Sequence, residues 1–158
     1  MKVFLRIVAI ALVAVLAVGC KKAPPPAPPE KPLVAPATVD DTAAWKEYVK
    51  QRSIRWMKEQ GKHGRTYATF LAHDQDSTEL IKSTQDNIDR GILAGTIMFF
   101  GSPDSARMVD LIEQAFKGAK EKSLNGVYVV FIGNATEKDR AQAAVAPSGA
   151  ELVFLEAK

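Results

Sequence analysis

Three polar loops offer the first candidates for chemistry in this chain. Each follows an apolar stretch of strand-forming residues: His-Asp-Gln-Asp-Ser-Thr at 73–78, Gly-Ser-Pro-Asp-Ser at 101–105 and Gly-Asn-Ala-Thr-Glu-Lys-Asp at 133–139. In parallel α/β sheets, ligands bind outside the carboxyl ends of the strands, where such loops meet. The candidate binding residues are His73, Asp74, Ser102, Asp104, Asn134 and Thr136. The same loops precede predicted helices, so these side chains could instead serve only as helix caps.

The first of these loops resembles a known catalytic motif. Asp74, Asp76 and Thr78 form the pattern Asp-x-Asp-x-Thr after a strand. It is similar to the first motif of the haloacid-dehalogenase-type phosphatases, in which the first Asp is the nucleophile and the second the acid/base. The resemblance implies these roles for Asp74 and Asp76 and implies Mg²⁺ as cofactor. It also implies that Ser102 binds phosphate and that the conserved lysine is Lys120 or, alternatively, Lys117.

The chain departs from that family pattern at several positions. His73 stands between the apolar stretch and Asp74, and a helix predicted from Ser77 leaves no room for the usual flap. Asn134 replaces the Asp expected in the Mg²⁺ loop. A phosphatase therefore stays an alternative function, and the prediction leans toward a protein that is not an enzyme.

Other chemistries find fewer matching residues. The sequence contains neither a Gly-x-Ser-x-Gly elbow nor a Gly-rich phosphate loop. Its two histidines, His63 and His73, would need carboxylates to complete a zinc site, and no metal site is predicted. No basic block is interleaved with aromatic residues, which gives no support for nucleic-acid binding.

The elements that must position these loops alternate along the chain. Caps at 40–42 begin a helix that ends near Gly61 and carries aromatic residues on one stripe. The remaining elements are strands at 65–72, 95–100, 127–132 and 151–155, and helices from Ser77, from the Ser102 cap with Pro103 at its first position, and from Thr136 with Asp139 three residues on. Continuous apolar strands separated by amphipathic helices indicate a parallel sheet covered on both faces. We predict a small doubly wound α/β/α sandwich with a four-stranded, mostly parallel sheet, preceded by an N-terminal helix.

The N-terminus has the features of an export signal. Lys2 and Arg6 form a basic region ahead of the apolar segment 7–18. This segment is too short to predict a membrane-spanning helix. The following Leu-Ala-Val-Gly-Cys resembles the lipobox of bacterial lipoproteins, which implies cleavage before Cys20 and lipidation of that residue. Lys21, in place of Asp, implies the outer membrane and its periplasmic face.

A proline-rich segment separates this signal from the globular part. Seven of the nine prolines lie between Pro24 and Pro36, and proline favours extended polyproline II geometry over helix or sheet. We therefore divide the chain into a signal peptide at 1–19, a lipidated Cys and tether at 20–39, and an α/β domain at 40–158.

Composition narrows the functional classes further. Removal of Lys2 and Arg6 from the 21 basic residues leaves 19 against 18 acidic ones, so the mature chain is almost neutral. Cys20 is the single cysteine, and its acylation leaves no thiol for disulfide or redox chemistry. The expectation is a non-enzymatic outer-membrane lipoprotein that binds another cell-envelope protein, as an assembly or secretion accessory or as an inhibitor or immunity factor. A small-ligand or peptidoglycan binder is a further alternative, and no cofactor is predicted outside the phosphatase alternative.

Overall fold

The computed structural model describes residues 32–158. The predicted signal peptide, the lipidation site at Cys20 and the tether up to Lys31 lie outside the described residues. The α/β unit begins at Pro32 and ends at Lys158.

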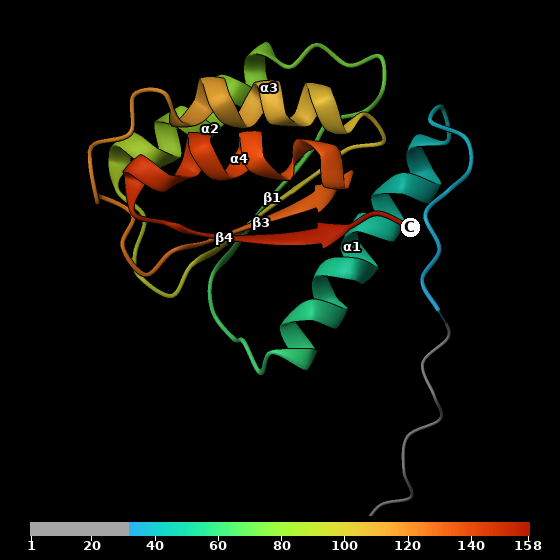
Figure 1. Cartoon of the computed structure of the whole chain (residues 1–158), viewed down its shortest axis with the longest axis horizontal. Helices are drawn as coiled ribbons and strands as arrows, with labels where there is room; N and C mark the ends of the chain where they lie inside the picture. The colour runs from blue at the N-terminus through green and yellow to red at the C-terminus, as the bar shows by residue number, and fades with distance from the viewer. Residues whose placement is uncertain (1–31) are drawn as a thin grey trace, which may run out of the picture. The chain divides into compact units, whose positions relative to one another are not determined.

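The centre of this unit is a single sheet of four parallel strands in the order β1-β2-β3-β4 (Figure 1). The strands are β1 (Thr66–Phe70), β2 (Ile97–Gly101), β3 (Tyr128–Gly133) and β4 (Glu151–Glu156). One row of the register joins Ala68, Phe99, Val130 and Val153 across all four strands. Strands β2 and β3 are buried along almost their whole length, which explains their continuous apolar sequence. The outer strands β1 and β4 are partly exposed.

Helices cover the two faces of the sheet unequally. The connecting helices α2 (Thr78–Arg90), α3 (Ser105–Phe116) and α4 (Lys138–Val145) all lie on one face, and α1 (Thr42–Glu59) lies on the other (Figure 1). Short 3₁₀ turns flank α4 at Ala135–Glu137 and Ala146–Ser148. This arrangement confirms the predicted α/β/α sandwich, its four-stranded parallel sheet and its preceding helix. The strand order never reverses, however, so the second layer of helix comes from α1 and not from crossovers to both faces.

The larger core lies between the sheet and the three connecting helices. Tyr67, Met98, Phe100 and Phe131 point to this face from the strands, and helix α3 contributes the most buried residues. The fully buried side chains of α3 are Met108, Val109, Leu111 and Ile112. Because α3 packs between α2 and α4, it is enclosed by protein on three sides and carries the centre of this layer.

Helix α1 makes a smaller, aromatic core on the opposite face. Trp45 and Tyr48 pack edge to face with ring centroids 5.6 Å apart, and Trp56 packs against Phe99 at 6.0 Å. Gly101, the last residue of β2, allows the close approach of this helix. The predicted aromatic stripe therefore faces the sheet, as core residues do.

The chain just before α1 also contacts the folded unit. Leu33 and Ala35 pack against the aromatic core, and the Ala35 amide donates to the Lys158 carbonyl at 3.0 Å. The Trp45 indole N–H donates to the Thr38 carbonyl at 3.0 Å. Residues from about 33 onward, which fall within the predicted tether, thus contribute to the packing of the domain.

Two predicted helix starts are wrong in detail. Asp104, and not Ser102, caps α3, because its carboxylate accepts from the Arg107 amide at 3.1 Å. Near Thr136 the chain first forms a 3₁₀ turn, and α4 begins at Lys138 without a side-chain cap. In contrast, Asp41 caps α1 through the Ala44 amide at 3.0 Å, within the predicted range of caps.

The close contact at Gly101 gives a test of the packing of α1. A Cβ added there would lie 2.7 Å from Val49 Cγ2, so Gly101→Ala should lower the free energy of unfolding by about 1–3 kcal/mol. Chemical denaturation should show that Val49→Ala, in the same chain, relieves part of this loss, so the double variant is more stable than the sum of the single losses predicts. Gly118→Ala, with no atom within 4 Å of the new Cβ, is the control and should not destabilise the protein. Strictly additive losses at residues 49 and 101 would contradict this packing.

Candidate functional site

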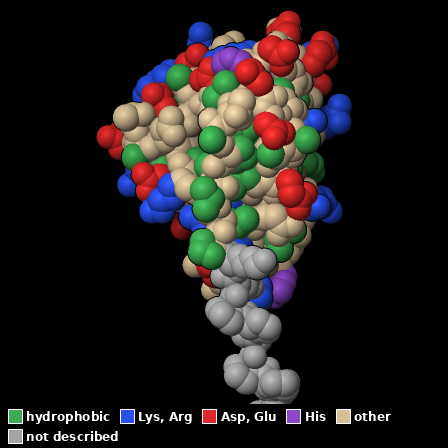
Figure 2. Space-filling view, turned by 90° about the vertical axis from the view of Figure 1, so that its right-hand side faces the viewer, with side chains coloured by type: hydrophobic (Ala, Val, Ile, Leu, Met, Phe, Trp, Pro, Cys, Tyr) green, Lys and Arg blue, Asp and Glu red, His purple; other side chains and the backbone are tan. Residues whose placement is uncertain are grey.

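The structure brings the three candidate loops to one edge of the sheet. They follow the carboxyl ends of β1, β2 and β3, on the side toward which the strands point (Figure 1). Figure 2 views the molecule from this side and shows hydrophobic side chains among groups of acidic and basic ones. The question is which side chains at this edge are available to a ligand and which are held by the protein itself.

The aspartates of the first loop have different roles. Asp76 Oδ1 accepts from the Thr78 amide at 2.8 Å and from Thr78 Oγ1 at 2.7 Å, at the start of α2. These hydrogen bonds, first that from the amide and then that from the hydroxyl, lower the pKa of Asp76. A general acid at neutral pH needs a raised pKa, so this environment opposes the acid/base role implied by the resemblance. Asp74 is exposed and lies at the tip of the same loop.

Arg107 ties this loop to the body of the protein. Its guanidinium donates to the carbonyls of Ala72, at 3.3 Å, and of His73 and Gln75. The Ala72 amide in turn donates to Gln75 Oε1 at 3.2 Å, which closes the turn from within. One arginine on α3 therefore fixes the backbone of the loop that follows β1.

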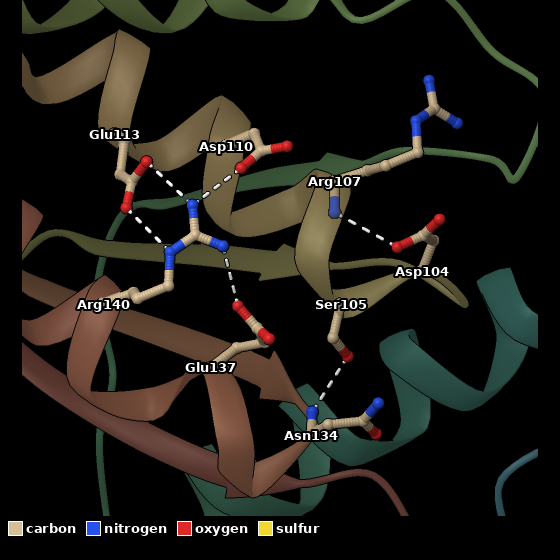
Figure 3. A network of polar contacts seen from close by, with 8 residues as sticks. All are labelled: Asp104, Ser105, Arg107, Asp110, Glu113, Asn134, Glu137 and Arg140. Atoms are coloured by element: carbon tan, nitrogen blue, oxygen red, sulfur yellow. Dashed lines mark hydrogen bonds and ion pairs between the residues drawn. The ribbon is translucent and has the colours of Figure 1, made fainter.

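The second and third loops are also joined by their polar side chains. Ser102 is buried, and its Oγ accepts from the Asp104 amide at 3.0 Å. The buried Ser105 Oγ accepts from the Asn134 amide at 2.9 Å, which links the start of α3 to the end of β3 (Figure 3). Asp104 thus caps α3, Ser102 accepts from the backbone of its own loop, and Ser105 connects the second loop to the third.

The remaining candidates lie on the surface of this edge. His73, Asn134 and Thr136 are exposed, and Asn134 makes no side-chain cap to the turn that follows it. Asp74, Gln75 and Asp76 of the first loop are exposed as well. The Ser102 hydroxyl, which is 1% exposed, is not accessible in the same way.

The lysine implied by the phosphatase resemblance lies elsewhere. Lys117 and Lys120 follow the end of α3, near the start of β3, where the Lys122 amide donates to the Pro147 carbonyl at 3.1 Å. This is the amino edge of the sheet, about 17 Å from the carboxyl edge along a five-residue strand. The structure therefore brings Asp74, Asp76 and Ser102 to one edge and does not bring Lys120 to them. In the described part of the chain, no group of three or more His, Cys, Asp or Glu side chains is placed to hold a metal ion.

A charged cluster between α3 and α4 was not predicted from the sequence. Arg140 on α4 donates to Asp110 at 2.7 Å, to Glu113 at 2.9 Å and to Glu137 at 2.9 Å (Figure 3). The hydrogen bonds that Arg140 donates to these carboxylates, that to Asp110 first, raise the pKa of Arg140. The cluster joins neighbouring helices on the surface, and its only sequence signal is the i, i+3 spacing of Glu137 and Arg140.

A groove beside α1 is a further open feature of the domain. It lies between α1 and the edge strand β1 and has a volume of about 230 Å³. Most of its lining is apolar, including Val49, Ile54, Met57 and Phe70, and Ile54 is 48% exposed. Lys46 and Lys50 line it from α1. The stripe of α1 to which Val49 and Met57 belong was predicted as core, and no groove was predicted beside it, because exposure of one side of a core-forming helix depends on the width of the sheet beneath it.

Comparison of the chain with protein-family models, with curated proteins and with solved structures gives no match. Within residues 32–158, none of the helices combines the length and apolar character needed to span a bilayer.

The geometry of the first loop predicts the outcome of a phosphatase assay. We expect no Mg²⁺-dependent hydrolysis of a phosphomonoester such as p-nitrophenyl phosphate, because Lys120 lies at the opposite edge and the Asp76 carboxylate is held by hydrogen bonds from Thr78 that lower its pKa. Asp74→Asn should therefore change only the free energy of unfolding, by less than about 1 kcal/mol, as is typical of an exposed substitution. Turnover in the parent protein that is lost in Asp74→Asn would contradict this prediction.

The contacts of Arg107 predict a local effect on the same loop. Arg107→Ala removes the donor for three carbonyls, so amide hydrogen exchange at Ala72 and Gln75 should accelerate while exchange in β3 stays slow. The global free energy of unfolding should fall by about 1 kcal/mol. Arg107→Lys is the matched control: it keeps the charge but lacks the planar fork, so it should restore little of the protection. Unchanged exchange in both variants would show that Arg107 does not hold the loop.

Proposed function

We propose that this protein is a lipid-anchored binding module of the bacterial outer membrane, which presents its α/β domain to the periplasm and binds another envelope protein without catalysis. Support for the anchor comes from the lipobox-like sequence ending at Cys20 and from the proline-rich segment that follows it. Because residues from about 33 onward pack against the domain, an extended tether from Cys20 to that point would hold it up to about 40 Å from the lipid. A domain held at that distance is suited to meeting a partner in the periplasm.

The groove between α1 and β1 carries the binding part of the proposal. Its lining combines the exposed Ile54 and other apolar side chains with two lysines, and the strand beside it is an edge strand of the sheet. Exposed apolar surface of this kind, bordered by polar residues, is typical of protein-binding sites. The side chains at the carboxyl edge favour this reading too, since most of those that point inward cap helices or tie loops together.

The same observations separate this proposal from its alternatives. A small-ligand or peptidoglycan binder would have to use the carboxyl-edge loops, where Ser102 is buried, Asp76 accepts from Thr78 and Asp104 caps α3. A phosphatase would need a lysine beside Asp74, and Lys120 is distant from it. Neither alternative is supported by a structural feature comparable to the groove between α1 and β1.

The anchor is tested by one substitution. Cys20→Ser removes the sulfur that the thioether requires, so metabolic labelling with palmitate should be lost and the precursor should stay uncleaved, with its apolar segment 7–18 still attached. Lys21→Ser is a neighbouring control that retains the sulfur and should still be labelled. Continued labelling of Cys20→Ser would contradict the lipoprotein assignment.

The binding function is tested in the native envelope, without reference to a particular surface. A lysine-reactive cleavable cross-linker, applied to cells that carry the affinity-tagged full-length protein, should give a discrete partner protein that co-purifies reproducibly. Cys20→Ser, which stays an uncleaved and unlipidated precursor, should capture less of this partner than the lipidated protein. Recovery of no discrete protein over an untagged strain would count against a binding module.

A further inference from the structure

The edge strand β1 turns one set of its backbone groups away from the sheet. The Arg65 carbonyl accepts from the Ile97 amide at 2.9 Å, and the Leu71 amide donates to the Gly101 carbonyl at 3.2 Å, so the odd-numbered residues of this stretch bond to β2. Backbone groups alternate sides along a strand, and Thr66, Ala68 and Phe70 therefore direct their N–H and C=O groups outward. Within residues 32–158 these outward groups have no hydrogen-bond partner.

The side chains of the same three residues border the groove. Thr66, Ala68 and Phe70 line it from β1, whereas Tyr67 packs into the core on the opposite face. A further strand paired with β1 would thus place alternate side chains directly over the groove. Unpaired backbone and apolar lining belong to one continuous surface, and a single extended segment can satisfy both.

The charges at this surface indicate the composition of such a segment. Lys46 and Lys50 are the charged side chains that line the groove, and no carboxylate lines it. Lys46 Nζ lies 5.6 Å from the centre of the Phe70 ring. Glu47, the neighbouring carboxylate, already accepts from Gln51 at 2.6 Å and from Lys50 at 3.3 Å. An incoming chain with Asp or Glu beside its apolar residues complements these lysines.

The two edges of the sheet differ in how well they resist added strands. Strand β4 has Glu151 and Glu156 at its ends, and the groove beside it contains both acidic and basic side chains. Strand β1, Thr-Tyr-Ala-Thr-Phe, has neither a charged residue nor a proline within it. Charges and prolines are the usual protection of an exposed edge, so β1 is the edge open to pairing.

We propose that β1 and the groove beside α1 bind an extended segment of a partner protein, which adds to the sheet as a fifth strand, places apolar side chains in the groove and directs a carboxylate to Lys46 and Lys50. This inference rests on the proposed binding function and specifies its site and the chemistry of its partner. Recognition by strand addition takes affinity from backbone hydrogen bonds and specificity from alternate side chains. A second copy of this chain is a poorer occupant, because pairing of two β1 edges would bring four groove lysines together with no carboxylate in the lining.

One substitution removes a hydrogen-bond donor from the outer side of β1 and leaves the hydrogen bonds to β2 intact. Ala68→Pro eliminates the Ala68 N–H, which points away from β2, and proline is tolerated on an edge strand at such a position. Ala68→Val keeps the N–H, is a good strand former and serves as the matched control. Circular dichroism and thermal melting should show both variants folded. Lys46→Glu combined with Lys50→Glu tests the charges separately, on residues that are exposed and outside the core.

The probe is a random 12-residue peptide library displayed on phage, selected against the full-length mature protein in detergent. Enriched peptides should alternate apolar residues and carry Asp or Glu. Synthetic copies should bind Ala68→Val as they bind the parent, and should bind Ala68→Pro and the double Lys→Glu variant at least tenfold more weakly. In the complex, amide exchange at Ala68 and Phe70 should slow, while exchange at Tyr67 and Thr69, already bonded to β2, should not change.

Several results would overturn the inference. The inference is wrong if no peptide is selected, or if the selected peptides are basic. It is also wrong if peptides bind Ala68→Pro as tightly as Ala68→Val, or if their binding does not slow amide exchange at Ala68 and Phe70. A parent dimer that becomes monomeric in Ala68→Pro would show that a second copy occupies the edge instead. If the envelope partner still cross-links equally to Ala68→Pro and Ala68→Val, this site is wrong while the binding function stands; loss of all partners in the parent would refute the binding function itself.

Discussion

The direction in which the sheet is wound determines most of the architecture of this domain. Each connection between parallel strands is expected to be right-handed, and each successive strand is added on the same side of the previous one. Under these two conditions every crossover helix must lie on the same face. Helices α2, α3 and α4 do so, and they leave the other face of the sheet without any crossover to cover it (Figure 1). A parallel sheet cannot leave that face to water, so a helix outside the βα repeat has to cover it.

Helix α1 meets this requirement only in part. Four strands place the outer strand axes about 14 Å apart, whereas a helix with its side chains is about 10 Å wide. The aromatic residues of α1 lie over β2, β3 and β4, where Trp56 meets Phe99 and Trp45 packs near Ile132. The flank toward β1 stays open, and Ile54 and Met57 border it. The groove is thus a geometric consequence of covering a four-stranded sheet with one helix, and an edge strand with unpaired backbone groups lies beside it.

Much of the fold could be predicted from the sequence because its signals are local. The apolar stretches at 97–101 and 128–133 are short and rich in aromatic or β-branched residues, which favours buried strands, and both are central in the sheet. Asp41 begins α1 as a capping residue should. Strand order is not a local property: a sandwich wound in one direction and one wound in both have the same alternation of strands and helices, and only packing distinguishes them. The prediction that Ser102 caps α3 was wrong for a related reason: Asp104, two residues later in the chain, offers an equally good side-chain oxygen.

The candidate site was less accessible to prediction, because its residues act through contacts between elements distant in the chain. Arg107 is separated from the loop that it holds by more than 30 residues, and no spacing in the sequence joins them. The placement of Lys120 depends on α3 running opposite to the strands, which carries everything after its end to the amino edge. A sequence pattern such as Asp-x-Asp-x-Thr specifies only one loop, whereas a catalytic set requires several loops at one edge.

The winding also explains why polar residues at the carboxyl edge have structural roles. In open α/β sheets the ligand-binding crevice forms where the strand order reverses, because the loops on either side of that point diverge to opposite faces. This sheet has no reversal, so its first three loops all turn toward the same layer of helices and pack against one another. Ser105 reaches Asn134 and Arg107 reaches His73 for this reason. The unpaired surface lies instead beside α1, and there the apolar lining, the two lysines and the outward backbone of β1 are suited to an extended chain.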